Sequence, residues 1–202
     1  MKNETLDWYQ ENAESFIGNT ENVDMTEHYR AFLELVPSGG KILDLGCGAG
    51  SATVHFMKSG YQVTAVDGCA EMVDHTWNIS GCQARQLLFE ELDYSDVFDG
   101  VWACASLLHV HKAELPDILR LVHKALKEGG VLYASFKYGD EERVKDDGRL
   151  FSDFTEDSVR ALFEGVGGFL LKNVWVSDDQ RPERAGERWV NVLCVAEKST
   201  LF

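Results

Sequence analysis

Ile42-Leu43-Asp44-Leu45-Gly46-Cys47-Gly48-Ala49-Gly50 reads as a short buried strand that runs directly into a glycine-rich turn. Residues 51–59 behind it have a helical pattern, with Gly60 as the stop. Glycines between a strand and a helix allow positive φ angles and let a ligand approach the backbone. The free N–H groups at the start of the helix favour an anionic group. This context predicts a turn that binds a nucleotide-like ligand.

The spacing of the glycines departs from that of dinucleotide-binding enzymes. Gly46 and Gly48 match the pattern G-x-G-x-x-G, but Ser51 occupies its third position and Gly50 is shifted by one. This form leaves room for a smaller anion, such as an amino-acid carboxylate. Asp67 ends the next predicted strand, about 20 positions after the first glycine, where an acid can accept both ribose hydroxyls of a nucleoside. The combination predicts a nucleoside-type cofactor and makes a nicotinamide-dependent oxidoreductase a remote alternative.

Beyond the turn the chain alternates between strand and helix patterns, which predicts parallel strands with crossover helices on both faces. Gly129-Gly130 is expected to end the last helix of this region. Strands are predicted at residues 63–66, 84–89, 97–104 and 131–136, and helices at residues 69–77 and 113–127.

The two ends of the chain differ from this central region. A helical lead-in is expected at the start, while residues 140–153 read as a charged loop that is either solvated or a lid. Strands at residues 169–176 and 190–196 are separated by a segment too polar for a helical crossover, so we expect an antiparallel hairpin. The prediction is an α/β, Rossmann-like, doubly wound sheet of seven strands, mostly parallel with an antiparallel C-terminal hairpin. We expect one domain over residues 1–202, with a lead-in at 1–38, a cofactor-binding core at 40–137 and a substrate side at 138–202.

Charge is the most informative feature of the composition. The 202 residues include 19 Lys and Arg against 34 Asp and Glu, a net charge of −15, which disfavours nucleic acid and anionic membranes as partners. No apolar run is long enough to span a bilayer, and no leader-like segment is recognised, so a cytoplasmic location is expected. The five cysteines have no metal-ligand spacing, so we expect reduced thiols and no metal site. They are Cys47, Cys69, Cys82, Cys104 and Cys194, of which the first, second and fourth fall at strand ends, where they could line a site.

The segment from residue 40 to residue 137 resembles the class I S-adenosylmethionine-dependent methyltransferases. Ile42 to Gly50 looks like the first motif of that family, and Val66-Asp67-Gly68-Cys69-Ala70-Glu71-Met72-Val73 looks like the second. The segments from Phe98 to Val110 and from Lys127 to Leu132 resemble its fourth strand and the turn into its fifth. The family's last strand is reversed, as expected here. Within the family, the chain looks closest to small stand-alone enzymes often labelled tellurite-resistance-like.

The resemblance implies roles for individual residues in holding S-adenosylmethionine. The backbone at Gly46 and Gly48 would hold the methionine moiety, and Asp67 would bind the ribose. Many relatives carry an acid after the third strand for the adenine amino group, and here that acid is either Glu90 or absent. The full set of expected cofactor-binding residues is Asp44, Gly46, Cys47, Gly48, Asp67, Gly68, Met72, Phe89, Glu90, Cys104 and Ala105.

Candidate substrate-side residues follow the fourth and fifth strands, where ligands bind in such sheets. His109 is either a base or substrate contact, or a packing histidine. Tyr138 could contact substrate or take part in catalysis, whereas Lys137 is expected to be solvated and His111 to lie on the surface. Tyr9 in the lead-in either closes over the cofactor or packs as an ordinary helical aromatic.

A late segment gathers arginines in an otherwise acidic chain. It could recognise a carboxylate or phosphate on the acceptor, or its arginines could pair with nearby acids, which we favour. The segment contains Arg181, Arg184, Arg188 and the aromatic Trp189, and of these Arg181 and Trp189 are the candidates for substrate binding. The nearby acids are Asp178, Asp179, Glu183 and Glu187.

The reaction implied by the resemblance is in-line methyl transfer to a small-molecule acceptor. Such transfer depends mainly on alignment and exclusion of water, and needs a base only when the nucleophile arrives protonated. Two alternatives stay open: a methyltransferase acting on a tRNA or protein, and an S-adenosylmethionine-binding protein without transfer activity. The acceptor, the atom methylated and the oligomeric state do not follow from the sequence.

Overall fold

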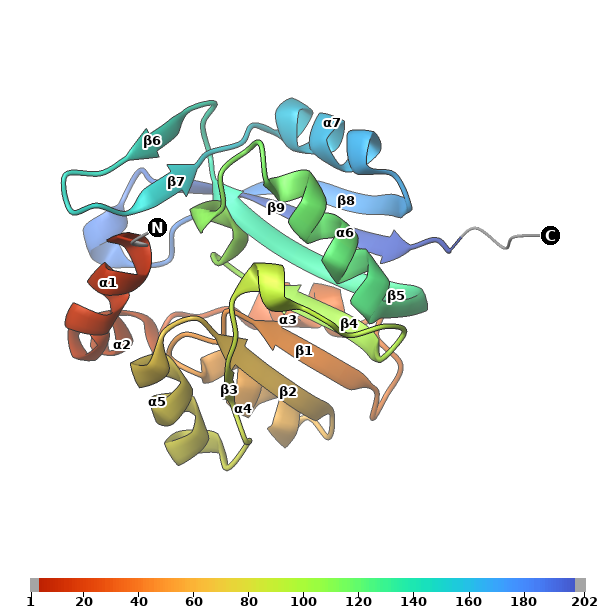
Figure 1. The fold of residues 1–202 in the computed structure, drawn as a ribbon, viewed down its shortest axis with the longest axis horizontal. Helices are drawn as coiled ribbons and strands as arrows, with labels where there is room; N and C mark the ends of the chain where they lie inside the picture. The colour runs from red at the N-terminus through yellow and green to blue at the C-terminus, as the bar shows by residue number, and fades with distance from the viewer. Residues whose placement is uncertain (1–3, 199–202) are drawn as a thin grey trace.

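The buried strand before the glycine-rich turn lies inside a seven-stranded sheet in the computed structural model, which describes residues 4–198 (Figure 1). Within these residues the strand order is β3-β2-β1-β4-β5-β9-β8, and every strand is parallel to β1 except β9. This confirms the predicted doubly wound sheet. The strands are β1 (Lys41–Leu45), β2 (Gln62–Asp67), β3 (Arg85–Gln86), β4 (Phe98–Ala103), β5 (Leu126–Lys137), β8 (Phe169–Asp178) and β9 (Arg188–Ala196).

The two faces of the sheet pack against separate sets of helices through apolar side chains. Phe32 and Phe56 pack with Ile42 on one face, and the buried residues around Leu43 and Phe163 fill the other. Helices α3 (Thr26–Leu33), α4 (Ser51–Lys58) and α5 (Ala70–Ser80) cover the first face, and α6 (Leu115–Ala125) and α7 (Glu156–Val166) cover the second. Alternate side chains of a strand point to opposite faces, so each strand contributes to both layers.

The end of the chain forms the expected antiparallel hairpin. Strand β9 pairs with β5 over Val131 to Lys137 and with β8 on its other side. Residues 179–187 connect β8 to β9 and contain one short 3₁₀ turn, Pro182–Arg184. The connection stays irregular because its charged side chains bond to one another rather than forming a helical crossover.

Three boundary predictions were wrong. The third strand covers Arg85–Gln86 rather than 84–89, because Phe89–Glu91 turns into a 3₁₀ helix. The helix predicted at 113–127 ends at Ala125, and Gly129-Gly130 lies inside β5, whose pairing with β4 shifts register there. Tertiary pairing with β4 therefore prevails over the helical pattern at residues 126–127.

The charged segment at residues 140–153 is not the predicted loop. It forms a two-stranded antiparallel ribbon of β6 (Glu142–Val144) and β7 (Leu150–Ser152). All three residues of β7 are buried, so the ribbon has an apolar side despite its charge. The sequence pattern missed it because each strand is only three residues long.

The expected helical lead-in is present as α1 (Glu4–Glu11), α2 (Ala13–Thr20) and α3; its first three residues and residues 199–202 lie outside the described part. Helix α1 lies beside the ribbon, where the Leu150 N–H donates to Thr5 Oγ1 at 3.0 Å. Arg149 stacks over the Trp8 ring at 3.5 Å. These contacts join the start of the chain to a segment about 145 residues later. In residues 4–198 no helix is long and apolar enough to cross a membrane.

Candidate active site

A cavity of about 960 Å³ opens at the carboxyl ends of the parallel strands. Its floor is the glycine-rich turn and the ends of β1, β2 and β4, and its roof is helix α1 with the β6–β7 ribbon. The far wall comes from β5 and the connection between β8 and β9. Ligands bind at this edge in doubly wound sheets, where the strand order reverses between β1 and β4.

The glycine-rich turn is fixed by close packing. The N–H groups of Gly46 and Cys47 both donate to the Val66 carbonyl at 2.9 Å. A Cβ at Gly46 would lie 2.4 Å from the Ser106 Cβ, and Gly46 has a φ of +81°, so only glycine fits. Helix α4 then begins after Gly50 without a side-chain cap and lines the cavity. Its unpaired N–H groups suit a carboxylate.

Asp67 connects the end of β2 to this turn. Its carboxylate accepts the Gly48 N–H and the Cys69 N–H, both at 2.9 Å. Burial raises the pKa of Asp67, and these backbone N–H groups act in the opposite direction. A carboxylate has about four lone-pair sites, so these backbone donors leave acceptor capacity for the hydroxyl groups of a ribose.

Asp44 lies beneath the turn, fully buried, and accepts a hydrogen bond from Thr53 Oγ1 at 2.6 Å. Burial raises the pKa of Asp44 to about 7, although the Thr53 hydroxyl favours the ionised form. A buried carboxylate that titrates near neutrality responds to any cationic group brought into the cavity.

The expected adenine side is lined by Gly68, Met72, Phe89 and Glu90. The neighbouring acid, Glu91, accepts the Leu88 N–H and so caps the local 3₁₀ turn. The exposed Glu90 has no such structural bond among the described residues and faces the cavity, which makes it the better of the two acids for an adenine amino group.

Cys104 and Ala105 also line the cavity, next to the end of β4. Ala105 has a φ of +51°, unusual for a residue with a side chain, and its N–H donates to Ser135 Oγ at 2.9 Å. Strained backbone held by its surroundings is common at functional sites.

Of the three cysteines at strand ends, Cys47 and Cys104 line the cavity. Cys69 packs instead with Ala13 and Met72. Burial raises the pKa of both Cys69 and Cys104 to about 11, so these thiols stay protonated and weakly nucleophilic. Among residues 4–198 no cluster of three His, Cys, Asp or Glu side chains could hold a metal ion.

His109 and Tyr9 meet across the cavity, although they are 100 positions apart. His109 Nδ1 lies 2.7 Å from the Leu150 carbonyl oxygen, and Nε2 lies 2.8 Å from the Tyr9 hydroxyl. A carbonyl only accepts, so Nδ1 carries the proton and Nε2 accepts the Tyr9 O–H. Burial lowers the pKa of His109 to about 4 and raises that of Tyr9 to about 12. The pair is therefore neutral at physiological pH. His111 is exposed, as expected.

Tyr138 does not line the cavity, and Lys137 does. Tyr138 packs against the core on the other face of β5, with the Arg188 guanidinium 4.3 Å from its ring centre. Lys137 is only 8% exposed, so the expectation of a solvated lysine was wrong. Strand alternation explains both placements, because Tyr133 and Ser135 share the parity of Lys137 and also line the cavity.

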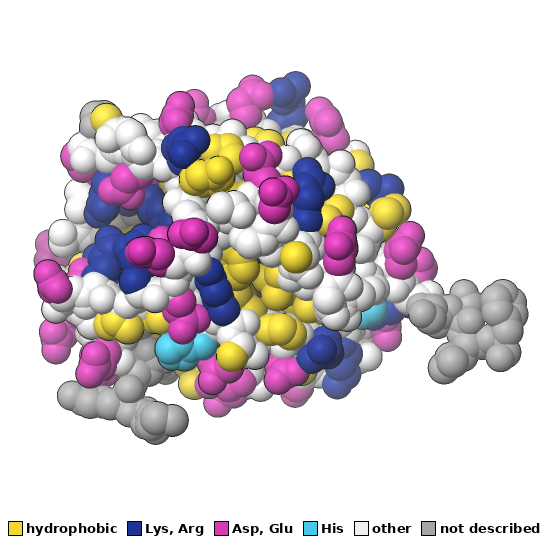
Figure 2. All heavy atoms as spheres, turned by 90° about the horizontal axis from the view of Figure 1, so that it is seen from above, with side chains coloured by type: hydrophobic (Ala, Val, Ile, Leu, Met, Phe, Trp, Pro, Cys, Tyr) yellow, Lys and Arg dark blue, Asp and Glu magenta, His cyan; other side chains and the backbone are white. Residues whose placement is uncertain are grey.

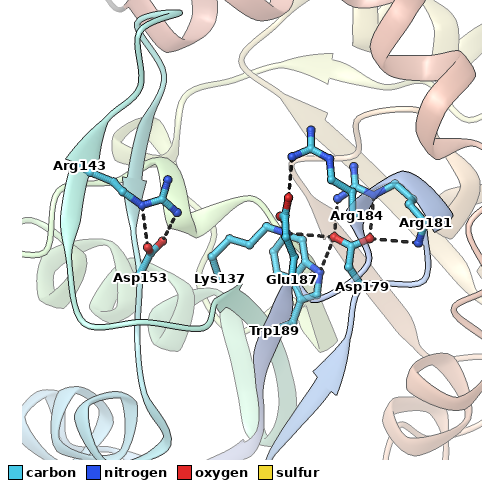
Figure 3. A network of polar contacts seen from close by, with 8 residues as sticks. All are labelled: Lys137, Arg143, Asp153, Asp179, Arg181, Arg184, Glu187 and Trp189. Atoms are coloured by element: carbon cyan, nitrogen blue, oxygen red, sulfur yellow. Dashed lines mark hydrogen bonds and ion pairs between the residues drawn. The ribbon is translucent and has the colours of Figure 1, made fainter.

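Lys137 belongs to a polar network with the β8–β9 connection (Figure 3). Its ammonium donates to Asp179 at 2.9 Å and to Glu187 at 2.5 Å. Asp179 also accepts from Arg181 and from Trp189 Nε1, at 2.6 and 3.0 Å. Burial alone would raise the pKa of Asp179, but the hydrogen bonds from Arg181 and Lys137 outweigh it and hold that pKa low. The favoured interpretation of ion pairing is confirmed for Arg181 and Arg184, whereas Arg188 lies over the Tyr138 ring. Arg181 and Trp189 also line the cavity.

The sequence analysis missed the cavity residues of the ribbon and of the middle of the sheet. Lys145 and Arg149 lie on the ribbon and face the cavity. Trp102 and Tyr133 stack with ring centres 4.0 Å apart at its inner side. The alternation of side chains along β4 and β5 could have indicated that the aromatic pair faces the cavity. No local signal distinguished Lys145 or Arg149 from other charged residues.

A comparison with family models matches residues 43–134 to a methyltransferase domain. The matched segment contains the end of strand β1, the glycine-rich turn and Asp67, the residues on which the resemblance in sequence rests. Over these residues the chain is similar to methyltransferase domains, and its sheet has the strand arrangement expected from the resemblance to class I S-adenosylmethionine-dependent methyltransferases. The similarity to a tellurite-resistance-like subgroup is not confirmed.

Curated proteins similar to this chain match part of it. It is 34% identical over 98 residues to an uncharacterized methyltransferase of Synechocystis sp., covering 48% of this chain and 46% of that protein. It is 36% identical over 120 residues to the ubiquinone biosynthesis O-methyltransferase of Xanthomonas axonopodis pv. citri, covering 54% and 47%. The matches thus span about half the length of these relatives.

A solved structure shares the fold over nearly the whole chain. The 1,6-didemethyltoxoflavin-N1-methyltransferase of Burkholderia thailandensis, crystallised with 1,6-didemethyltoxoflavin and S-adenosylhomocysteine, aligns with a TM-score of 0.78. The alignment covers 96% of this chain and 85% of that one, at 22% identity.

Proposed function

We propose that the protein transfers a methyl group from S-adenosylmethionine to a small-molecule acceptor held in the cavity. The observation that carries this proposal is a single roofed cavity. The same space is lined by the glycine-rich turn, by Asp67 and by the Tyr9–His109 pair. Residues 40–137 would supply the cofactor side, and the lead-in and residues 138–202 would supply the acceptor side.

The residues present fit the proposed cofactor. The uncapped start of α4 would receive the carboxylate of its methionine moiety, and Asp67 would accept its ribose hydroxyls. Gly68 and Met72 offer an apolar border for the base. When bound, S-adenosylmethionine supplies a methyl group activated by the sulfonium. The protein then contributes alignment and exclusion of water.

The Tyr9–His109 pair is positioned to take a proton from the acceptor. An acceptor hydroxyl or amine that donates to Tyr9 Oη could lose its proton there, while the Tyr9 proton passes to His109 Nε2. The Leu150 carbonyl accepts from Nδ1 and keeps the ring in the required tautomer. General-base assistance of this kind contributes about 10²–10⁴-fold to rate. His109 would thus act through Tyr9 rather than on the acceptor directly.

The roof favours a small acceptor over a macromolecule. The Leu150 N–H donates to Thr5 of α1, and Arg149 stacks on Trp8, so α1 and the ribbon together cover part of the cavity and restrict access by a tRNA or protein. The net charge of −15 further disfavours a nucleic acid.

Calorimetric titration with S-adenosylhomocysteine, followed by incubation of the protein with methyl-labelled S-adenosylmethionine and a metabolite extract, tests the proposal. We expect binding and a labelled low-molecular-weight product. The Asp67→Ala variant should bind at least tenfold more weakly because the ribose hydroxyls lose their acceptor. Asp74→Ala, an exposed acid on α5, is the matched control and should bind normally.

Each other outcome has its own meaning. Absence of S-adenosylhomocysteine binding contradicts the proposed function. Binding without any labelled product favours a non-catalytic cofactor-binding protein. Label that appears in tRNA or protein but not in small molecules favours the macromolecular alternative.

A further inference from the structure

Three cations of the β6–β7 ribbon surround one aromatic ring at the roof of the cavity. The side chains of Arg143, Lys145 and Arg149 lie 5.2, 4.5 and 5.6 Å from the centre of the Phe151 ring. Phe151 in turn contacts the His109 ring edge-on, with centres 5.0 Å apart. The cationic group therefore lies one ring away from the Tyr9–His109 pair.

Two of these cations are neutralised, and the third is not. Arg143 forms a two-pronged ion pair with Asp153, and Arg149 pairs with Asp147. The Lys145 ammonium has no hydrogen bond or ion pair with any carboxylate in residues 4–198. Its one described partner is the face of Phe151.

The surroundings make this lysine poorly compensated. Partial burial, and then the nearby guanidinium groups of Arg149, Arg184 and Arg143, lower the pKa of Lys145, and the Glu187 carboxylate acts in the opposite direction to a smaller extent. A bound anion would relieve both the lost hydration and the repulsion between cations. Because the chain as a whole carries a charge of −15, a locally positive surface at this place is not a consequence of composition.

Three cations line the cavity and are partly buried. Lys145, Arg149 and Arg184 all line it, the first two from the roof and the third from the β8–β9 connection. Figure 2 shows Lys and Arg side chains gathered around a hollow at the left of the molecule, on the side where the ribbon and this connection lie in Figure 1.

We propose that the methyl acceptor carries an acidic group, a carboxylate or a phosphate, which Lys145 binds directly with Arg149 and Arg184 beside it. This inference rests on the proposed function and names the substrate class of the same cavity. Lys137 is a poorer anchor, because Asp179 and Glu187 already neutralise it. Arg184 also pairs with Glu187, at 2.9 Å, so Lys145 is the cation assigned to direct binding. Arg149 is held by Asp147 and by the Trp8 ring, so it is preorganised for a planar anion.

Calorimetry on the protein saturated with S-adenosylhomocysteine tests the proposal with three ring compounds. Benzoate and phenyl phosphate carry the proposed group, and benzamide is the neutral match of the same shape. At low salt we expect one or both anions to bind at least tenfold more tightly than benzamide. The tighter of the two anions identifies the acidic group as a carboxylate or a phosphate.

The Lys145→Met variant should lose at least tenfold in anion affinity and little in benzamide affinity. Lys112→Met is the matched control, because Lys112 also lies over an aromatic ring, that of Phe154, but does not line the cavity. The proposal is overturned if benzamide binds as tightly as the anions, if neither anion binds, or if Lys145→Met keeps the affinity of the unmodified protein.

Failure of this inference can be told apart from failure of the proposed function. Normal binding of S-adenosylhomocysteine together with no anion preference rejects the inference alone. If S-adenosylhomocysteine itself does not bind, the proposed function fails, and the same anion titrations on the free protein still decide whether Lys145 forms an anion site.

Discussion

Burial changes the pKa values of individual residues in the cavity. Asp44 and His109 are ordinary titratable residues, yet burial raises the pKa of the first to about 7 and lowers that of the second to about 4. At pH 7 the site thus contains a carboxyl group that titrates near neutrality and a neutral imidazole. Both are poised to respond to charge that arrives with a ligand.

The Asp44 pKa predicts a pH-dependent affinity for S-adenosylmethionine, whose sulfonium and ammonium groups are cationic. A nearby cation favours the ionised carboxylate, so below pH 7 binding must displace a proton from Asp44. We expect affinity measured by calorimetry to rise about three- to tenfold from pH 6 to pH 8. Asp44→Asn should abolish this slope, and an unchanged slope in that variant would assign the proton to Asp67, whose pKa is also raised.

The contrast between Lys137 and Tyr138 shows what residue-level prediction can miss. Lys137 ends β5 and Tyr138 follows it, and an aromatic hydroxyl was the more attractive candidate for substrate contact. Parity along the strand places Lys137 with Tyr133 and Ser135 in the cavity, and Tyr138 with the opposite core. Alternate residues of a strand face opposite sides of the sheet, and this pattern can be read from the sequence. It decides which residue faces the cavity, whatever the chemistry of the side chain.

At the scale of elements, the irregular connection between β8 and β9 is held by charge. The Asp179 side chain is only 2% exposed and accepts hydrogen bonds from Lys137, Arg181 and Trp189. Removing one partner of a buried ion pair leaves the other charges uncompensated, which costs more than the pair contributes. The connection therefore depends on this one carboxylate for its conformation.

Asp179→Asn is expected to lower the free energy of unfolding by about 3 kcal/mol, measured by urea denaturation at pH 7. The neighbouring, exposed Asp178→Asn should change it by less than about 0.5 kcal/mol. The low pKa of Asp179 means that its contribution is present above pH ~4 and is lost as the pH falls further. The difference between the two variants should accordingly shrink under acidic conditions, and equal stability at pH 7 would refute the role given to Asp179.

The ribbon of β6 and β7 is the element that sequence patterns could not reveal. Its strands are too short for a periodic signal, and its charges suggest a solvated loop. Only packing of the buried β7 residues against the core, with Thr5 bonded to Leu150, makes it a roof. As a result, Lys145 and Arg149 enter the site from a segment that local reasoning assigned to solvent.

At the scale of the whole molecule, the cofactor side spans residues from the end of β1 to beyond β4. A ligand held there touches several strands and two helices, so its binding is linked to cooperative unfolding. At a hundredfold excess over Kd, S-adenosylhomocysteine should stabilise the protein by about 2.7 kcal/mol. For a chain of this size that corresponds to a rise in Tm of about 5–10 °C, measurable by scanning calorimetry. Asp67→Ala at the same ligand concentration should show a smaller rise, and no rise in the unmodified protein would contradict cofactor binding.

The sequence by itself determined the doubly wound sheet, the glycine-rich turn at Gly46 to Gly50 and the acid at Asp67. These features depend on local sequence. Glycine conformations, the periodicity of strands and helices, and the spacing from the turn to the acid each involve no more than a few tens of residues. The meeting of Tyr9 with His109 across 100 positions, and of the ribbon with α1, was decided by the tertiary structure. Such contacts arise because remote segments bury their apolar sides against a shared core, and no local pattern specifies which charged residues that burial turns toward the cavity.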